Sequence, residues 1–397
     1  MIQRPEYLNK LVGFKDAPII KIVTGVRRCG KSTLFELYRD HLLGSGVEPR
    51  QIHSVNFEDA RYAGLLDWQT LHDHLRGNLL PEARNYIFLD EIQKVPDFQK
   101  AVDSLCLDKN VDVYLTGSNA YLFSGAIATL LSGRYIEIRM LPLSFREYLS
   151  TRDDPANLPA AFRDYLRDSS FPFVSVNRWN RGQILNYLDS LYASIILKDV
   201  VECVKIRDPL RLERIVKFLF NNIGNETSLN NIVNTMKADK QTISHADLGV
   251  YLNALIACYV LYPAHRYNVK GKQLLKTNAK YYVVDPGLRY ALLGEIAGDD
   301  GHILENIVYL ELLRRDYKVY VAKVGSAEVD FIAVRDGKTE YYQVSQSVLD
   351  PRTLERELAP LNAIADHNQK FLLTMDYSLS SHNGIQQRNV LEWLIGQ

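Results

Sequence analysis

The sequence contains few cysteines and no excess of charge of either sign. Four cysteines occur in 397 residues, with no C-x-x-C pair, which argues against a disulfide framework or a zinc site and favours a reducing, cytoplasmic setting. Lysine plus arginine number 47, as do aspartate plus glutamate, so the formal net charge is zero. A protein that coats polyanions through its overall charge is therefore excluded. Any nucleic-acid binding must depend on a local basic surface.

Long apolar runs are also missing. The longest stretch without a formal charge, 248–265, contains Asn253, Pro263 and three tyrosines, so it is a poor membrane span. Charges and a proline stand among the first seven residues, and we expect no signal peptide. The 14 prolines and 22 glycines are too few for a disordered or collagen-like chain. We expect a soluble protein without membrane contact, folded into roughly two to four domains.

A strand, a glycine-rich loop and a helix follow one another near the N-terminus. The β-branched run 19–24 leads into a segment that matches G-x-x-x-x-G-K-[ST] at every fixed position. Such a loop directs backbone N–H groups at phosphates, and the following helix adds the positive end of its dipole. We expect Lys31 to reach the β- and γ-phosphates of ATP, and Ser32 to hold Mg²⁺. The candidate nucleotide-binding residues are Gly25, Val26, Arg27, Arg28, Cys29, Gly30, Lys31, Ser32 and Thr33.

Two adjacent carboxylates follow a second apolar run. Residues 86–89 lead directly into Asp90 and Glu91, so both acids are expected at the carboxyl end of a buried strand of the same sheet. A P-loop site needs such an acid to complete its metal site, and Asp90 is the candidate. Glu91 is placed to polarise the attacking water. The pair therefore predicts hydrolysis rather than nucleotide binding alone.

Three further polar residues are candidates for catalytic contacts. Ser118 and Asn119 follow the apolar run 111–116, where they could bond the γ-phosphate or the attacking water, or form an ordinary polar turn. Arg134 precedes the alternating run 136–140, where it could reach a phosphate of its own or of a neighbouring subunit, or remain solvated. The residue types alone leave these alternatives open.

These segments together carry a family resemblance. Their spacing resembles that of AAA-type P-loop ATPases of bacteria and archaea that are fused to a C-terminal domain of unknown function, and the segments are GVRRCGKS, YIFLDEIQKV, VYLTGSNAYL and LSGRYIEIRMLPLSFREYL. The resemblance covers nearly the whole chain and implies an α/β fold with a parallel sheet, a helical lid and Mg²⁺-dependent ATP hydrolysis. The roles that it implies are Walker A for Lys31 and Ser32, Walker B for Asp90 and Glu91, sensor 1 for Ser118 or Asn119, and a finger or sensor arginine for Arg134.

The rest of the chain is expected to form three further domains. Helical periodicity in 162–166 and 184–195 predicts the lid. Three helices, the last over 242–257, precede a hairpin of 259–263 and 280–284, which is an order typical of a winged helix. The expected domains are therefore an AAA-type P-loop core at 1–140, a helical lid at 141–205, a winged helix at 206–300 and a small α/β nuclease-like domain at 301–397.

A basic loop joins the two strands of the expected hairpin. The sequence between Asp247 and Asp285 contains no acid and five bases, which are Arg266, Lys270, Lys272, Lys276 and Lys280. The pattern predicts contact with DNA phosphates through Lys270, Lys272 and Lys276, for positioning rather than base readout. A solvated loop and a protein-binding module remain open as alternatives, and the sequence does not decide whether the chain forms a homo-oligomer.

The last hundred residues resemble the core of PD-(D/E)xK nucleases. A helix over 304–313, a strand and a hairpin around Asp336-Gly337 follow in that order. Glu305 and Asp330 match the first two positions of the catalytic motif, but Gln343 and Ser345 replace its carboxylate and lysine. An amide is a weaker Mg²⁺ ligand and a hydroxyl supplies no cation. We therefore predict an inactive nuclease-like scaffold.

The function that these patterns favour is Mg²⁺-dependent ATP hydrolysis, coupled to the winged-helix and nuclease-like module. Two alternatives remain open. One is an ATP-switched DNA-binding regulator in which hydrolysis is incidental, and the other is an ATP-gated nuclease.

Overall fold

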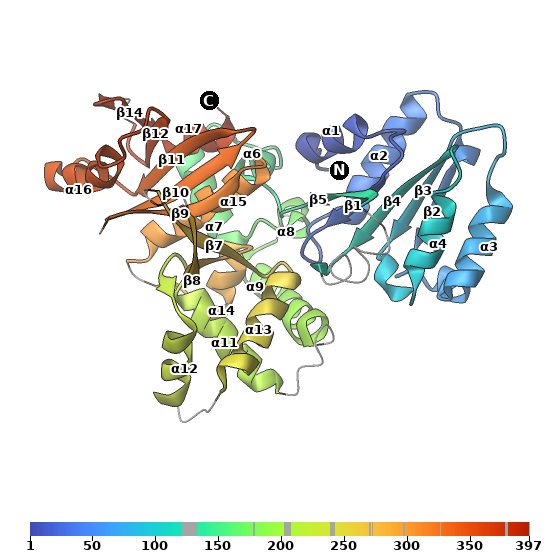
Figure 1. Ribbon diagram of the computed structural model, residues 1–397, viewed down its shortest axis with the longest axis horizontal. Coiled ribbons are helices and arrows are strands. Elements are labelled where there is room, and N and C mark those ends of the chain that lie inside the picture. The colour runs from blue at the N-terminus through green and yellow to red at the C-terminus, as the bar shows by residue number, and fades with distance from the viewer. Residues whose placement is uncertain are drawn as a thin grey trace. The chain divides into compact units, whose positions relative to one another are not determined.

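The computed structural model describes most of the chain in two compact units (Figure 1). The first unit consists of Met1–Pro142 and Ala257–Tyr259, and the second of Leu143–Ile256 and Val260–Gln397. The described residues are 1–120, 133–177, 179–201, 208–238, 243–269, 271, 273–296, 298–325, 327–377 and 380–396, with the side chains of 197, 198 and 274–277 left out. Among these residues, no helix combines the length and apolar character that crossing a membrane requires.

The first unit is built on a five-stranded sheet. Its strands are β1 (Ile20–Thr24), β2 (Ile52–Asn56), β3 (Asn85–Asp90), β4 (Val111–Gly117) and β5 (Tyr135–Arg139), in the order β2-β3-β4-β1-β5. All four neighbouring pairs are parallel. Every residue of β1, β3 and β4 is buried, as expected of continuous apolar runs in a parallel sheet. The expected α/β fold with a parallel sheet is confirmed.

Helices cover both faces of this sheet. The elements are α1 (Pro5–Gly13), α2 (Lys31–Gly44), η1 (Pro49–Gln51), η2 (Ala60–Leu65), α3 (Trp68–Asn78), η3 (Ile92–Lys94) and α4 (Phe98–Leu105). Figure 1 shows α3 and α4 beside each other along one face, where Leu71 and Val102 pack with the apolar side chains of the strands. Tyr38 of α2 packs against Phe88 and Tyr114 on the other face. This packing fixes the strand ends that carry the candidate site.

The second unit begins with helices. They are α6 (Phe145–Leu149), α7 (Leu158–Asp168), α8 (Pro172–Val176), α9 (Arg181–Tyr192), the π-helix η5 (Ala193–Val200), α11 (Pro209–Asn221), α12 (Leu229–Ala238), α13 (His245–Ala257) and α14 (Pro286–Leu293). Ser144 and Glu147 cap α6 reciprocally, and Asn180 and Gln183 do the same for α9. The helices predicted over 162–166 and 242–257 are thus present, with shifted ends.

A nine-stranded sheet completes the second unit. Its order is β13-β14-β12-β11-β10-β9-β7-β8-β6, and the strands are β6 (Glu226–Thr227), β7 (Leu261–Asn268), β8 (Gln273–Val283), β9 (Lys318–Val324), β10 (Ala327–Arg335), β11 (Lys338–Ser345), β12 (Gln369–Thr374), β13 (Ser381–His382) and β14 (Ile385–Asn389). The helices α15 (Asp300–Arg314), α16 (Pro351–Asn362) and α17 (Val390–Ile395) accompany it. Both predicted hairpins are present, as β7–β8 and β10–β11. Asp336 and Gly337 have positive φ at the second turn, as a two-residue hairpin requires.

The two hairpins lie in one sheet. β7 pairs in parallel with β9, and Tyr267 lies opposite Ala322. The expected division at residue 300, between a winged helix and a nuclease-like domain, therefore does not separate two sheets. Side chains from β8 can meet side chains from α15 and β10 as a result.

Candidate functional site

The loop after β1 wraps around the side chain of Lys31. Gly25 has φ of 149°, and a Cβ at this position would lie 2.2 Å from the carbonyl oxygen of Met140, so only glycine fits. Gly30, with φ of 104°, precedes α2. The Lys31 Nζ donates to the carbonyls of Gly25 at 3.1 Å and Val26 at 3.4 Å. The backbone forms a cradle around Lys31, and the loop ends at the N-terminus of α2, where free backbone N–H groups are suited to bind an anion.

Asp90 lies at the carboxyl end of β3, beside this cradle. Its side chain is buried, and burial raises its pKa, although hydrogen bonds with Ser32 and Thr116 act in the opposite direction. The Thr116 hydroxyl donates to Asp90 and accepts from the backbone N–H of Glu91 at 2.8 Å. Ser32 and Asp90 therefore present a hydroxyl and a carboxylate oxygen together, as a Mg²⁺ site requires.

Glu91 follows in a left-handed conformation, with φ of 54°. Its Oε1 lies 3.5 Å from the Lys31 Nζ, and its Oε2 accepts from Gln93 and from the Ser118 hydroxyl at 3.3 Å. Burial alone would raise the pKa of Glu91, but the charge of Lys31 and the hydrogen bond from Gln93 bring it below its usual value. The buried Glu91 carboxylate is therefore ionised at neutral pH.

Gln93 is a site residue that the sequence pattern did not single out. Its amide nitrogen donates to Ser118 Oγ at 3.2 Å, in addition to Glu91. Its buried Oε1 has no hydrogen-bond partner within the part of the chain that the structure describes. An orphaned acceptor beside Glu91 is suited to hold a water molecule. Its position two residues after Glu91 was the only signal for it in the sequence.

Arg4 also contributes to the cradle. Its guanidinium is buried and donates to the carbonyls of Cys29 at 3.1 Å and Leu141 at 2.7 Å. The Tyr7 hydroxyl accepts from the backbone N–H of Leu141 at 3.1 Å. Arg4 and Tyr7 therefore connect the N-terminal residues by hydrogen bonds to the P-loop and to the segment after β5. Because these two acceptors are backbone carbonyls, no side-chain motif could reveal the contacts.

The remaining loop residues differ in their accessibility. Val26 and Cys29 are buried, while Ser32 and Arg28 are exposed, and Thr33 is half-buried. Arg27 forms an ion pair with Glu58, with 2.7 Å between Nη2 and Oε1. Asn119, half-buried, follows Ser118. The structure therefore brings Gly25, Gly30, Lys31, Ser32, Asp90, Glu91 and Ser118 to one edge of the sheet.

Arg134 does not belong to this group. Its carbonyl accepts from the backbone N–H of Ile20, at the amino end of β1, whereas the P-loop follows the carboxyl end of that strand. Five strand residues separate these ends by about 16 Å, which is farther than an arginine side chain reaches. This distance argues against a contact with a phosphate held by its own P-loop, which is one of the alternatives that the sequence leaves open for Arg134. A role toward a neighbouring subunit stays a prediction.

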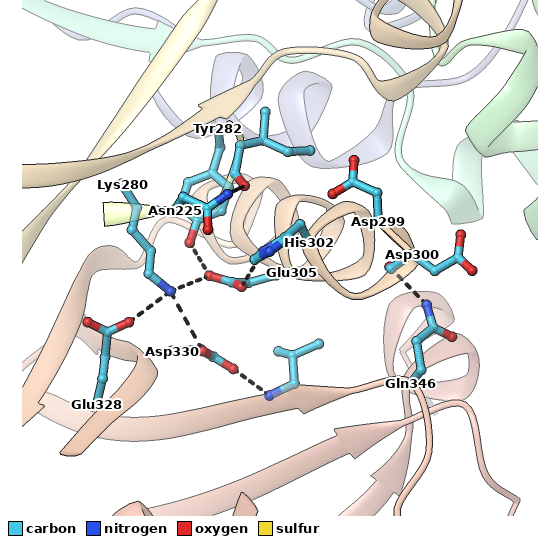
Figure 2. A network of polar contacts seen from close by, with 12 residues as sticks. Asn225, Lys280, Tyr282, Asp299, Asp300, His302, Glu305, Glu328, Asp330 and Gln346 are labelled. Carbon is cyan, nitrogen blue, oxygen red and sulfur yellow. Dashed lines mark hydrogen bonds and ion pairs between the residues drawn. The ribbon is translucent and has the colours of Figure 1, made fainter. Parts of the chain in front are cut away.

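A second polar cluster lies in the second unit, between α15 and the nine-stranded sheet (Figure 2). Lys280 of β8 points toward Glu305 of α15 and toward Glu328 and Asp330 of β10. Its Nζ lies 2.9 Å from Glu305, 2.9 Å from Glu328 and 3.8 Å from Asp330. Lysine thus supplies the positive charge to the acids that match the nuclease motif.

The carboxylate oxygens of this cluster already have protein partners. Glu305 accepts from Tyr282 as well as Lys280, and Asp330 accepts from the backbone N–H of Val344 at 2.9 Å. Burial raises the pKa of Asp330, as does the nearby charge of Glu305. No group of three or more His, Cys, Asp or Glu side chains in the described ranges is arranged to hold a metal ion.

The side chains at the two substituted motif positions bond groups other than the carboxylates of this cluster. Gln343 donates from its amide to Glu357 of α16 at 2.8 Å, and its Oε1 accepts from the backbone N–H of Asp330 at 3.3 Å. The Ser345 hydroxyl donates to the carbonyl of Ser347 at 3.3 Å. Neither side chain replaces the missing carboxylate or lysine. The positive charge comes instead from Lys280, which the sequence analysis counted among the five bases of the hairpin.

The basic loop is smaller than its residue count suggests. Arg266 is buried and pairs with Glu226 at 2.5 Å, and Lys280 belongs to the acid cluster. Lys270 and Lys272 lie outside the described residues, as does the side chain of Lys276. The interpretation of Arg266 and Lys280 as part of a free basic surface is therefore wrong.

Comparisons with known proteins agree with the P-loop geometry. A family model described as an AAA domain matches residues 18–149, and one described as a domain of unknown function (DUF8612) matches residues 160–298. The Walker-type ATPase paby2304 of Pyrococcus abyssi superimposes with a TM-score of 0.50 at 18% identity, over 74% of this chain and 96% of its own. The fold of the chain is therefore similar to that of a P-loop ATPase.

Two relatives cover most of the chain. The uncharacterized protein MJ1544 of Methanocaldococcus jannaschii is 29% identical over 376 residues, which are 90% of this chain and 81% of the relative. An uncharacterized protein of Haemophilus influenzae is 36% identical over 400 residues, which span 100% of this chain and 99% of the relative. The chain therefore belongs to the family of the Haemophilus influenzae protein, and it carries an AAA domain in its N-terminal part, followed by the domain of unknown function.

Proposed function

We propose that the chain binds ATP with Mg²⁺ at the P-loop and hydrolyses it. The observation that carries this proposal is the convergence of four side chains at one edge of the five-stranded sheet. Lys31 lies 3.5 Å from Glu91, and Ser32 bonds Asp90. These side chains offer a cation for the phosphates (Lys31), two oxygen ligands for a metal ion (Ser32 and Asp90) and a base for the attacking water (Glu91).

Each side chain has a role that its environment supports. Lys31 now bonds two backbone carbonyls, and it would exchange them for phosphate oxygens, which are stronger acceptors. Ser32 and Asp90 would hold the metal ion. Bound Mg-ATP supplies the γ-phosphoryl group and a metal ion that neutralises its developing charge. Glu91, ionised and held by Gln93 and Ser118, would accept a proton from the attacking water.

Two substitutions separate binding from turnover. Lys31→Ala should abolish ATP binding, because the phosphate cation is lost. Glu91→Gln should keep binding but reduce turnover by about 100-fold or more, which is the contribution expected of a general base. Binding is measured by equilibrium titration with labelled ATP and turnover by phosphate release, with Lys109→Ala as the surface control in the same unit. Equal ATP binding by the wild type and Lys31→Ala would contradict the proposal.

We further infer that the second unit is a helical lid, a winged helix and a nuclease-like scaffold that does not cleave, whose state follows that of the nucleotide. What supports the loss of cleavage is the arrangement of the acid cluster. The Lys280 ammonium lies among the carboxylates that would have to bind Mg²⁺, and Gln343 is directed to Glu357. A cleaving site would need those oxygens for a metal ion.

A further inference from the structure

The two carboxylate oxygens of Glu91 have different partners. Oε1 lies 3.5 Å from the Lys31 Nζ. Oε2 accepts from the amide of Gln93 and from the Ser118 hydroxyl, the latter at 3.3 Å. The Glu91 side chain is only 10% exposed, so water competes little with these contacts. One oxygen therefore faces a cation, and the other is held by neutral donors.

The backbone of Glu91 is restrained as well. Its φ of 54° is in the left-handed region, which residues other than glycine seldom adopt. Its backbone N–H donates to the Thr116 hydroxyl at 2.8 Å. Strained residues of this kind persist where the surrounding contacts hold them, and they cluster at functional sites. The backbone therefore sets the direction in which the Glu91 side chain points, and the contacts of its oxygens set the orientation of the carboxylate.

Gln93 is bonded to both other groups at Oε2. Its amide nitrogen donates to Glu91 and, at 3.2 Å, to Ser118 Oγ. The Ser118 hydroxyl in turn donates to Glu91. Because an ionised carboxylate only accepts hydrogen bonds, the nitrogen of the amide and not its oxygen must face Glu91. The three side chains thus form a closed triangle, in which Gln93 donates to the other two.

Lys31 is the partner of Glu91 whose contacts must change when ATP binds. The neighbours of its ammonium are the carbonyls of Gly25 and Val26 and the carboxylate of Glu91. Phosphate oxygens are stronger acceptors for an ammonium than carbonyls are, so ATP would draw Lys31 toward its phosphates. The donors at Oε2 are not P-loop residues, and their bonds can remain. Oε1 is therefore the oxygen that becomes free.

We propose that Gln93 is a positioning residue, which holds Oε2 of Glu91 so that Oε1 takes the proton of the attacking water once Lys31 has turned to the phosphates. This inference rests on the ATP hydrolysis proposed above. Glu91 accepts one proton at Oε1 as the water oxygen bonds to the γ-phosphorus and the bond from that phosphorus to the bridging oxygen of ADP breaks. Gln93 keeps its own protons throughout and acts only through Glu91.

The first test is Gln93→Met, which keeps the length of the side chain and removes its donor. Its kcat should fall about tenfold, the loss expected when one hydrogen bond to a charged group disappears. Its ATP affinity should stay within about twofold, because the change touches no group that binds phosphate. Phosphate release at saturating ATP measures kcat, and titration with labelled ATP measures binding. Gln69→Met, the same change at an exposed position of α3, should alter neither.

A second variant and a second measurement do not depend on the packing of methionine or on turnover. Gln93→Glu keeps the shape of glutamine but has no N–H group and repels Glu91, so its kcat should fall at least as far. ADP with aluminium fluoride imitates the transition state, which an enzyme binds more tightly than its ground state. The gain in affinity that aluminium fluoride gives to ADP in the wild type should be about tenfold smaller in Gln93→Met.

A double-mutant cycle shows whether Gln93 acts through Glu91. Adding Gln93→Met to Glu91→Gln should cost no further turnover, because the base that Gln93 positions is already gone. A further loss of about tenfold in the double variant would overturn the inference. Wild-type turnover that Gln93→Met leaves unchanged would overturn this inference alone. A wild-type chain that releases no phosphate would overturn the proposed hydrolysis and this inference with it.

Discussion

Lys280 lies within ion-pair distance of three carboxylates that come from two different elements. Its Nζ lies within 2.9 Å of Glu305 and of Glu328, and 3.8 Å from Asp330. Burial alone would lower the pKa of Lys280, but these acids raise it, while the pKa of Glu305 is lowered by Lys280 despite its burial. An ammonium in this position satisfies the acids without a metal ion.

Replacing Lys280 by methionine should destabilise the second unit. The change leaves the acids buried without a counter-charge, at a cost of about 3 to 5 kcal/mol in the free energy of unfolding. Without the ammonium, the buried carboxylates have raised pKa values in the folded state. The folded state then binds more protons than the unfolded state, so its free energy of unfolding falls as pH rises. The loss of stability should therefore be larger at pH 8 than at pH 5. Urea denaturation at both pH values measures the effect.

The control for this substitution is Lys338→Met. Lys338 is exposed at the start of β11, so the same change of side chain should leave the free energy of unfolding nearly unaltered. A loss in Lys280→Met that is no larger than in Lys338→Met, or one that is equal at both pH values, would show that the ammonium does not hold the cluster.

At the scale of elements, the β7–β8 hairpin belongs to the sheet of the C-terminal residues. β7 pairs with β9, and β8 carries Lys280 into the acid cluster. Arg266 is engaged by Glu226. Of the five bases that made the hairpin basic, only Lys270, Lys272 and Lys276 remain for phosphate contacts. The hypothesis of a DNA-binding wing therefore depends on these three lysines, and their number limits how many phosphates the hairpin can contact.

A wing with three lysines predicts a shallow salt dependence. If this hairpin binds duplex DNA, the slope of log K against log salt should be no steeper than about −2.7, because each neutralised phosphate contributes about −0.9. Reversing the charge of Lys270, Lys272 and Lys276 should remove this salt dependence. In a separate assay, the wild-type chain should leave the DNA uncleaved in the presence of ATP and either Mg²⁺ or Mn²⁺. Fluorescence anisotropy and gel electrophoresis measure these outcomes.

Three results would count against these expectations. A slope that the triple variant leaves unchanged would place DNA binding elsewhere on the chain. A slope much steeper than −2.7 would require further basic groups. Metal-dependent cleavage that disappears in Asp330→Ala would show that the acid cluster is an active nuclease site and would revive the ATP-gated alternative.

The helices and strands that depend on short-range sequence patterns could be predicted from the sequence. The apolar run before Gly25, the two carboxylates after 86–89 and the Asp336-Gly337 turn all follow from short-range patterns. The pairing of β7 with β9 could not be predicted, because it joins strands about fifty residues apart and periodicity does not name a partner. The place of Arg134 beside the amino end of β1 could not be predicted for the same reason, since it depends on the register of β5 with β1.

At the scale of the whole molecule, the P-loop unit is not one continuous segment. Residues Ala257–Tyr259 belong to it, although the chain before and after them belongs to the second unit. Tyr259, with φ of 58°, donates from its hydroxyl to Glu137 Oε1 at 3.0 Å, and the Thr24 hydroxyl donates to the same oxygen at 2.6 Å. Thr24 directly precedes Gly25, so Tyr259 and the residue just before the P-loop share one hydrogen-bond acceptor, Glu137.

Removing the Tyr259 hydroxyl should therefore loosen the P-loop from a position far away in the sequence. In Tyr259→Phe, Glu137 loses a donor worth about 1.5 to 3 kcal/mol, as is usual for hydrogen bonds to charged groups. We expect faster hydrogen exchange in residues 20–31 and an ATP affinity reduced several-fold, measured by mass spectrometry and by titration. Tyr377→Phe, at a position 61% exposed, is the control. If both measurements were the same in the wild type and in Tyr259→Phe, the Tyr259 hydroxyl would not contribute to holding the P-loop.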